Sequence, residues 1–278
     1  MRHLISVGHT VVSLVRSSVS SNQNTKSLDS TAPHHLIIGD LNDEPVIPFN
    51  IDTIIHLAGQ VILPGVVDDD FLVKNRTIAE GLIRLMRRLD VDRVVNFSTA
   101  SIYGTVGNGS AIEDMSPHKP SPYGASKYAS EVKLSLFSEG LSLTHVRTPG
   151  IIGRGANPNL ITKLADYASA GGKIELAHLE ANFNNVVHVM DVCKFLDHLL
   201  LTNPIAGSDS VNLSSSSPIT IKEVGELILN FYGNRNPIQS RESSTPPFII
   251  DVNKLKQIYN FECLPVNQTI LRFLKEKQ

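Results

Sequence analysis

Residues 93–104 read RVVNFSTASIYG and residues 121–127 read SPYGASK. The first stretch opens as a short apolar run and ends in hydroxyl residues, which is typical of a buried strand followed by a turn. The second places Tyr123 and Lys127 four positions apart at the start of a helical segment (123–139), so both side chains share one helix face. Together they predict a strand, a turn and a helix that carries a phenol and an amine.

The alternation of strands and helices extends in both directions. Further apolar runs bounded by turn residues lie at 9–16, 36–38, 51–57 and 143–147. An apolar helix stripe recurs at Ile78, Leu82, Leu85 and Leu89. This order predicts an α/β fold with a doubly wound parallel (Rossmann-type) sheet.

The pattern changes after Pro149. The predicted helices over residues 221–232, 252–259 and 269–275 are separated by longer polar loops. We expect a first domain over residues 1–149 and a smaller C-terminal lobe over 150–278, with 186–201 packing back on the first domain.

The composition excludes several classes of protein. The 25 basic and 27 acidic residues nearly cancel, which argues against nucleic-acid and anionic-membrane partners. No run of about 18 apolar residues and no secretory leader is visible. Two cysteines, Cys193 and Cys263, indicate a reducing compartment. We therefore expect a cytoplasmic protein with a small-molecule substrate, and interpret the arginines 84, 87, 88 and 93 as a solvated face.

An ammonium group near a phenol favours the phenolate, and the lowered pKa suits a tyrosine to acid–base work near neutrality. The Tyr123–Lys127 spacing alone also fits an ordinary exposed helix pair. The strand-end hydroxyls of Ser98 and Thr99 favour the functional interpretation, because doubly wound sheets bind ligands at the carboxyl ends of their strands.

In combination these residues resemble the extended branch of the short-chain dehydrogenases/reductases, the NAD-dependent epimerase/dehydratase group. The matching segments cover residues 8–16, 39–41, 52–59, 75, 98–104, 121–127, 187–192, 212–214 and 220–223. The resemblance implies a dinucleotide-binding first domain and a mainly substrate-binding second lobe.

It also implies NAD or NADP as cofactor, and an epimerase or reductase acting at a hydroxyl or keto carbon, with a nucleotide sugar as one substrate class. Tyr123 would be the general acid/base, Lys127 would lower its pKa and hold the nicotinamide ribose, and Thr99 would bind the reacting oxygen. The implied cofactor-binding residues are Arg16, Asp40, Leu41, Leu57, Ala58, Gly59, Asn75, Ser98, Tyr123, Lys127 and Pro149. Arg16 at a strand end favours NADP, since arginine accommodates a 2′-phosphate.

One departure concerns the start of the chain. The family begins with a strand and a Gly-x-x-Gly-x-x-Gly turn, whereas residues 8–9 resemble the end of the helix that follows this turn. We expect about 20 to 25 residues to be lacking, with one long strand over residues 4–15 as an alternative. Loss of the turn would weaken cofactor binding on the order of a thousandfold. A catalytically impaired protein of the same fold, binding a ligand or partner, is therefore the competing hypothesis.

Other departures concern the substrate. Positions 184 and 185 are asparagine where UDP-galactose 4-epimerases carry an arginine, and Ala100 and Ser101 replace the Asp-Glu pair of the dehydratases. Sugar dehydration is therefore disfavoured, and a nucleotide sugar is not specified.

Two further expectations concern metal and oligomeric state. We interpret His188, with Asp191 and His198 nearby, as a buried hydrogen-bonding histidine and expect no metal. The resemblance also implies a homodimer that pairs through the helices near 71–89 and 123–139.

Overall fold

The structure is a computed structural model that describes residues 1–16, 33–61, 68–107 and 109–277. It divides into two compact units. Unit 1 comprises residues 1–96, 126–144 and 196–209, and unit 2 comprises residues 97–125, 145–195 and 210–278. The predicted boundary at residue 149 and the packing of residues 186–201 stay predictions.

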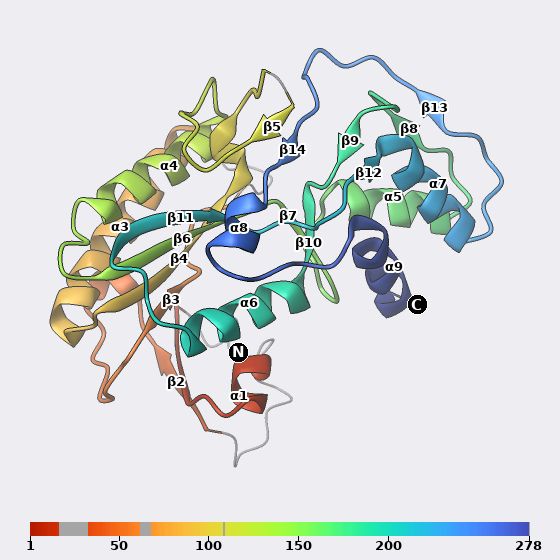
Figure 1. Ribbon diagram of the computed structural model, residues 1–278. Coiled ribbons are helices and arrows are strands. Elements are labelled where there is room, and N and C mark those ends of the chain that lie inside the picture. Colours follow the sequence, from red (N-terminus) through yellow and green to blue (C-terminus); the bar gives the residue numbers. More distant parts are fainter. Residues whose placement is uncertain (17–32, 62–67, 108, 278) are drawn as a thin grey trace. The chain divides into compact units, whose positions relative to one another are not determined.

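All four strands of the central sheet, which Figure 1 labels, begin in unit 1. The elements that begin in it are α1 (Arg2–Ser6), β1 (Val11–Val15), β2 (His34–Ile38), the 3₁₀ turn η1 (Leu41–Asp43), β3 (Ile54–His56), α3 (Asp68–Leu89), β4 (Arg93–Thr99), β6 (Ser142–Thr148) and β11 (Gly207–Asn212). Strands β11, β6, β4 and β3 form one sheet in that order, and β3 pairs with β4 in parallel. Strands β1 and β2 form a separate parallel pair. The predicted α/β fold with a parallel sheet and flanking helices is confirmed.

The core of unit 1 lies between the helices α3 and α4 (Pro122–Ser135) and the sheet. Leu82 and Met86 from α3 pack with Val94 of β4, Leu134 of α4 and Leu143 of β6, and all five side chains are buried. The apolar stripe read from the sequence of α3 is therefore the face that the helix buries.

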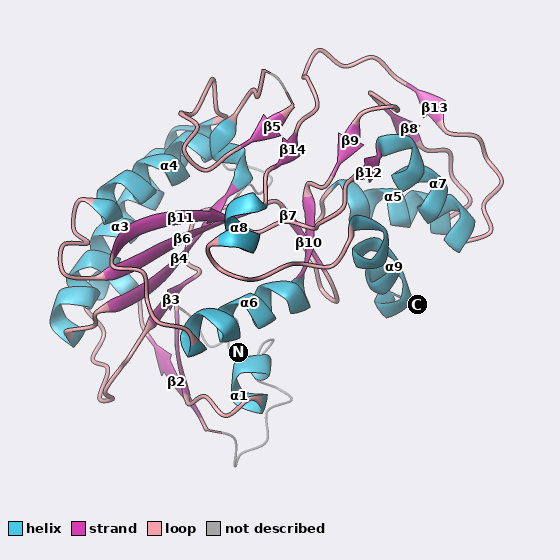
Figure 2. Ribbon diagram, in the orientation of Figure 1, coloured by secondary structure: helices cyan, strands magenta, loops and turns pink. Residues whose placement is uncertain are grey.

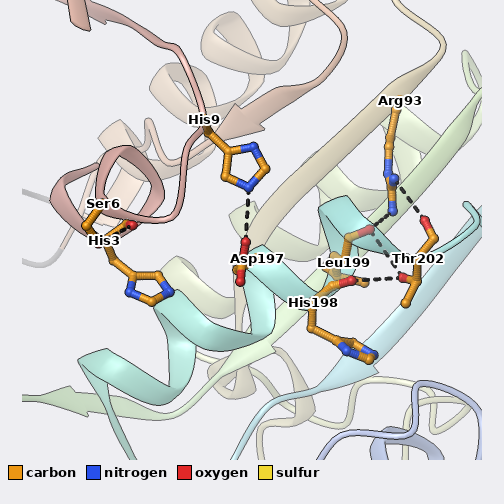
Figure 3. A network of polar contacts seen from close by, with 8 residues as sticks. All are labelled: His3, Ser6, His9, Arg93, Asp197, His198, Leu199 and Thr202. Atoms are coloured by element: carbon orange, nitrogen blue, oxygen red, sulfur yellow. Dashed lines mark hydrogen bonds and ion pairs between the residues drawn. The ribbon is translucent and has the colours of Figure 1, made fainter. Parts of the chain in front are cut away.

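Arg93 joins β4 to the end of helix α6 (Val189–Leu201). Its guanidinium donates hydrogen bonds to the carbonyl oxygens of Leu199 and, at 3.2 Å, Thr202, as Figure 3 shows. These carbonyls lie at the end of the helix, where C=O groups need partners from outside the helix, and the Leu199 oxygen also accepts from the Thr202 Oγ1 at 3.3 Å. His9 adds a contact of 3.0 Å to Asp197 on the same helix. Arg93 is therefore half-buried and bonded to the end of α6, a contact that its interpretation as part of a solvated face does not include.

Unit 2 holds the remaining elements, which Figure 2 distinguishes by type. Those that begin in it are the 3₁₀ turn η2 (Ala100–Tyr103), β5 (Ser110–Ala111), α4, β7 (Gly150–Ile152), α5 (Leu160–Ser169), β8 (Glu175–Leu176), β9 (Asn182–Phe183), β10 (Val186–His188), α6, β12 (Ile219–Thr220), α7 (Ile221–Phe231), β13 (Gln239–Ser240), β14 (Ile249–Ile250), α8 (Asn253–Gln257) and α9 (Val266–Lys277). Buried side chains of α5, α7 and α9 form one hydrophobic core, and a smaller one lies around η2, β5 and β14.

Two sequence predictions need correction. The alternative of one long strand over residues 4–15 is wrong, because α1 occupies residues 2–6 and β1 begins only at Val11. The helix predicted over 123–139 ends at Ser135, where the backbone tightens and the Phe137 amide bonds the Leu134 carbonyl. None of the described helices combines the length and apolar character needed to cross a membrane.

Candidate active site

A first group of candidate residues lies in unit 2, where strand β4 ends. Ser98 and Thr99 are both buried there. Thr99 caps the turn η2: its Oγ1 accepts a hydrogen bond from the Ser101 amide at 3.1 Å and donates one to the Ser101 Oγ, also at 3.1 Å. The Ser98 Oγ is buried without a hydrogen-bond partner among the described residues, which marks it as a group that a ligand would satisfy.

Helix α4 begins directly against this turn. A Cβ on Gly124 would lie 2.2 Å from the Ser101 carbonyl oxygen, so only glycine allows the first helical turn to approach η2 this closely. The Ser121 Oγ accepts a hydrogen bond from the Gly124 amide at 3.1 Å, which satisfies one free donor of the helix start. The approach brings Tyr123 close enough to Thr99 for the Thr99 side chain to influence the pKa of the phenol.

The electrostatics of Tyr123 differ from the simple expectation. Burial raises the pKa of the phenol above its usual range, and the Thr99 side chain opposes this rise. Burial has the larger effect because a phenolate loses more hydration than a phenol when water is excluded. The lowering of this pKa that the Tyr123–Lys127 spacing predicts is therefore not the dominant effect.

A second group of candidate residues lies in unit 1, around Lys127, four positions after Tyr123 in α4. Lys127 is buried, which lowers the pKa of its ammonium group, while the Glu131 carboxylate opposes that change. Its Nζ lies 3.7 Å from the position that a Cβ on Gly59 would occupy. The Lys127 amine therefore lies next to the turn that follows β3. Burial, reinforced by the charge of Lys127, lowers the pKa of His56 to about 3, so this histidine is neutral at pH 7.

Asn75 of α3 holds this turn in place. Its Oδ1 accepts a hydrogen bond from the Gln60 amide at 2.7 Å, and its Nδ2 donates to the Ser126 Oγ at 2.9 Å. A single buried amide thus connects the turn after β3 to helix α4, next to Lys127. Sequence reasoning placed Asn75 at the site but missed Ser126 and Gln60, whose spacing from it carries no local signal.

The other predicted cofactor residues lie at strand ends in their own units. In unit 1, Arg16 is exposed after β1, and Leu57 and Ala58 are exposed after β3. Asp40, after β2, accepts hydrogen bonds at its Oδ1 from the amide and side chain of Asn42. These bonds cap the turn η1, whose first residue is Leu41. In unit 2, Pro149 follows β6 and is half-buried. All of them follow the carboxyl ends of strands, where such sheets bind ligands.

His188 has a structural environment in unit 2. It is fully buried, its Nδ1 accepts from the Met190 amide at 3.2 Å, and its Nε2 lies 3.1 Å from the Glu276 carboxylate. This confirms the interpretation of a buried hydrogen-bonding histidine. Within the described part of the chain, no three His, Cys, Asp or Glu side chains gather as they would around a metal ion.

Asn184, which stands at a position that departs from the epimerase pattern, also has a structural role. Its Oδ1 accepts from the Ile250 amide at 2.8 Å and its Nδ2 donates to the Ile250 carbonyl at 2.8 Å. The side chain is buried, and this pairing with β14 uses both of its polar groups.

Comparison with known proteins agrees with this architecture. The chain is 24% identical over 216 residues to GDP-6-deoxy-D-talose 4-dehydrogenase of Aggregatibacter actinomycetemcomitans, covering 74% of this chain and 72% of that protein. It is 29% identical over 244 residues to UDP-glucose 4-epimerase of Mycolicibacterium smegmatis, covering 83% and 77%. The solved structure of MoeE5 in complex with UDP-glucose and NAD has the same fold, with a TM-score of 0.77 and 24% identity over 99% of this chain and 93% of that one.

A family model extends the match from single relatives to a whole group. The model of the NAD-dependent epimerase/dehydratase family covers residues 1–213, which include every strand of the central sheet and both groups of candidate residues. The chain therefore belongs to the NAD-dependent epimerase/dehydratase family.

Proposed function

We propose that the protein uses a nicotinamide cofactor to oxidise or reduce a hydroxyl or keto carbon of a nucleotide sugar, as an epimerase or a reductase. The observation that carries this proposal is the close approach of the start of α4, which bears Tyr123, to the turn after Thr99 at the end of β4, with Lys127 one turn further along α4. The names of the relatives, which specify GDP- and UDP-linked sugars, support the substrate class.

Two observations fit the residues to such a cofactor. The buried Ser98 Oγ is a polar group without a partner among the described residues, and the Lys127 ammonium lies in ordinary contact distance of the Gly59 turn. Ser98, Asn75, Gly59 and Lys127 are the residues that we assign to its binding. When bound, the nicotinamide supplies the hydride acceptor or donor.

The residues of the chain supply the proton chemistry. Tyr123 exchanges a proton with the reacting oxygen, and Thr99 donates a hydrogen bond that holds this oxygen in place. Burial raises the pKa of Tyr123, and the Thr99 side chain opposes this rise. To Lys127 we assign the role of a charge that favours the phenolate during the reaction.

The residues after Thr99 favour epimerisation or reduction over dehydration. Ala100 is a buried methyl group and Ser101 carries only a hydroxyl, so neither supplies a carboxylate to remove a proton from carbon. We propose NADP as the preferred cofactor, because the exposed guanidinium of Arg16 suits a 2′-phosphate.

The test is a pair of phenylalanine substitutions on the same helix. Tyr123→Phe removes the proposed acid/base, whereas Tyr128→Phe removes the hydroxyl of an exposed tyrosine and serves as the matched control. We expect turnover of UDP-glucose or UDP-galactose with NAD or NADP to fall at least about 100-fold in the first variant and to stay unchanged in the second. Full turnover by Tyr123→Phe would refute the assignment.

The competing function is a non-catalytic protein of the same fold that binds a small ligand or a partner. Calorimetric titration with NAD(H) and NADP(H) separates the two. Dissociation constants below about 1 mM, together with turnover, support the enzyme. Binding of a nucleotide sugar without either cofactor supports the alternative.

We further propose that the protein forms a homodimer through helices α3 and α4 of unit 1. Apolar side chains stay exposed on these helices or directly after them: Leu72, Val73, Tyr128, Val132 and Leu136. These exposed apolar side chains support an interaction site on the two helices, because large apolar patches on a protein surface mark such sites. Light scattering is expected to give twice the chain mass, and Val132→Glu is expected to give monomers. A wild-type monomer at micromolar concentration would contradict this part of the proposal.

A further inference from the structure

A buried side-chain amide, that of Asn212 at the end of β11, connects segments of unit 2 that lie far apart in the sequence. Its Oδ1 accepts a hydrogen bond from the Tyr103 hydroxyl at 2.6 Å. Its Nδ2 donates to the carbonyl oxygens of Ala111 and Asp251, both at 3.0 Å. The backbone amide of Asn212 donates to the Glu113 Oε1 at 2.8 Å. Asn212 is fully buried, and these bonds use both polar atoms of its side chain.

Arg147 of β6 reinforces the same connection. Its Nη1 donates to the Tyr103 hydroxyl at 3.2 Å and to the Glu113 carbonyl oxygen at 2.7 Å. Burial raises the pKa of Tyr103 to about 12, so the phenol keeps its proton near neutrality and donates it to the hydrogen bond with Asn212. Because a buried polar group is costly to leave unpaired, this network fixes the segments that it joins.

The network holds both ends of the loop that leads from η2 into α4. Tyr103 is the last residue of η2, and its carbonyl oxygen accepts a hydrogen bond at 3.2 Å from the His118 amide on the returning side of the loop. Gly104 has a φ of +64°, and a Cβ there would lie 2.2 Å from the His118 carbonyl oxygen, so glycine allows the two sides to meet. The beginning and the end of this loop therefore both depend on where Tyr103 is held.

We propose that Tyr103 and Asn212 are positioning residues, whose hydrogen bond fixes η2 and the start of α4 relative to each other. This inference rests on the proposed function, in which Tyr123 exchanges the proton and Thr99 holds the reacting oxygen. The step from η2 to α4 is short, because the backbone of η2 lies directly against Gly124 in the first turn of the helix. A shift of Tyr103 is therefore passed on to Tyr123.

The experiment uses Tyr103→Phe, which removes the hydroxyl and keeps the ring in the core around η2. The matched control is Tyr259→Phe, which removes the hydroxyl of another buried tyrosine of unit 2. For each variant we measure kcat and KM with UDP-glucose and NAD, normalised to folded protein, and hydrogen–deuterium exchange of the backbone amides. Asn212→Ser breaks the same hydrogen bond from its other side.

Tyr103→Phe is expected to lose on the order of tenfold in kcat, because small displacements of reacting groups slow the reaction steeply. The KM for UDP-glucose is expected to be unchanged. The His118 amide is expected to exchange on the order of tenfold faster, since the loop opens locally. Asn212→Ser is expected to give the same changes, and the double variant to be no slower than the slower single one. Tyr259→Phe is expected to keep the wild-type kcat and His118 exchange.

The outcomes separate the positioning role from the proposed function. If Tyr123→Phe abolishes turnover while Tyr103→Phe keeps the wild-type kcat, the positioning role is wrong and the proposed function stands. Equal losses of kcat in Tyr103→Phe and Tyr259→Phe, or additive losses in the double variant, also contradict the role. Unchanged exchange at His118 overturns it without reference to turnover. A wild-type chain without any turnover overturns the proposed function itself.

Discussion

Replacing Gly124 with alanine inserts a methyl group between helix α4 and the turn η2. Gly124 is buried in the first turn of α4, and a Cβ there would lie 2.2 Å from the carbonyl oxygen of Ser101 and 2.8 Å from its carbonyl carbon. A tolerable C···O contact is about 3.3 Å. The helix start and the turn must therefore separate by about 1 Å, which displaces Tyr123 from Thr99.

This displacement is expected to affect activity more than stability. A misplacement of about 1 Å at the reacting groups costs on the order of 100-fold in rate. For the free energy of unfolding, overpacking costs about 1–3 kcal/mol, while alanine is favoured over glycine within a helix by about 1 kcal/mol. The expected net loss is therefore about 0–2 kcal/mol, which leaves most of the protein folded.

The assay measures both quantities on the same preparation. Urea unfolding gives the stability, and turnover of UDP-glucose with NAD gives the rate. Gly107→Ala is the matched control, because no described atom lies within 4 Å of its Cβ position. If Gly124→Ala keeps turnover within about a factor of two of wild type, the close approach of α4 to η2 is not what positions Tyr123, and the reasoning fails.

Two further predictions concern stability. Arg93→Ala removes the charged donor from the carbonyls of Leu199 and Thr202, and we expect it to lower the free energy of unfolding in urea by about 1–3 kcal/mol. The control Arg76→Ala, at an exposed position, should lower it by less than about 1 kcal/mol. Equal losses in the two variants would contradict the capping role of Arg93. The pKa of His56 is about 3 in the folded chain against 6.5 in the unfolded one, so the unfolded chain binds more protons below pH 6.5 and stability falls as the pH drops toward 3, by about 1.4 kcal/mol per pH unit. His56→Gln should therefore lose less stability than wild type between pH 7 and pH 5, and identical acid losses would argue against a buried neutral histidine.

Much of the fold could be predicted because its signals are local. The strand expected over 93–98 is β4 (Arg93–Thr99), and the helical stripe of Ile78–Leu89 falls within α3. Apolar spacing along one segment reports which face that segment buries, whatever it packs against. The position of Tyr123 and Lys127 on one helix follows from the same local geometry, since α4 covers both.

The contacts that complete the candidate site could not be predicted in this way. Asn75 and Ser126 are 51 positions apart, and no periodicity relates them. The sequence analysis named Ser101 only because it and Ala100 replace the acidic pair of the dehydratases. Its contact with Thr99 depends on the turn η2. Arg93 was placed on a solvated face because Leu199, which it caps, lies 106 positions away.

By itself the sequence determined the family, the alternation of strands and helices, and the pairing of a phenol with an amine on one helical face, because each depends on residues that are near neighbours along the chain. Only the tertiary structure decided that Tyr123 lies close to Thr99 and that Gly124 allows helix α4 to approach the turn η2. It also decided that burial raises the pKa of the Tyr123 phenol, where the residue spacing predicts a lower pKa. These properties depend on how closely atoms from distant segments approach and on how much water they displace. Desolvation is a property of the surroundings of a group in space, and residue spacing along the chain does not encode it.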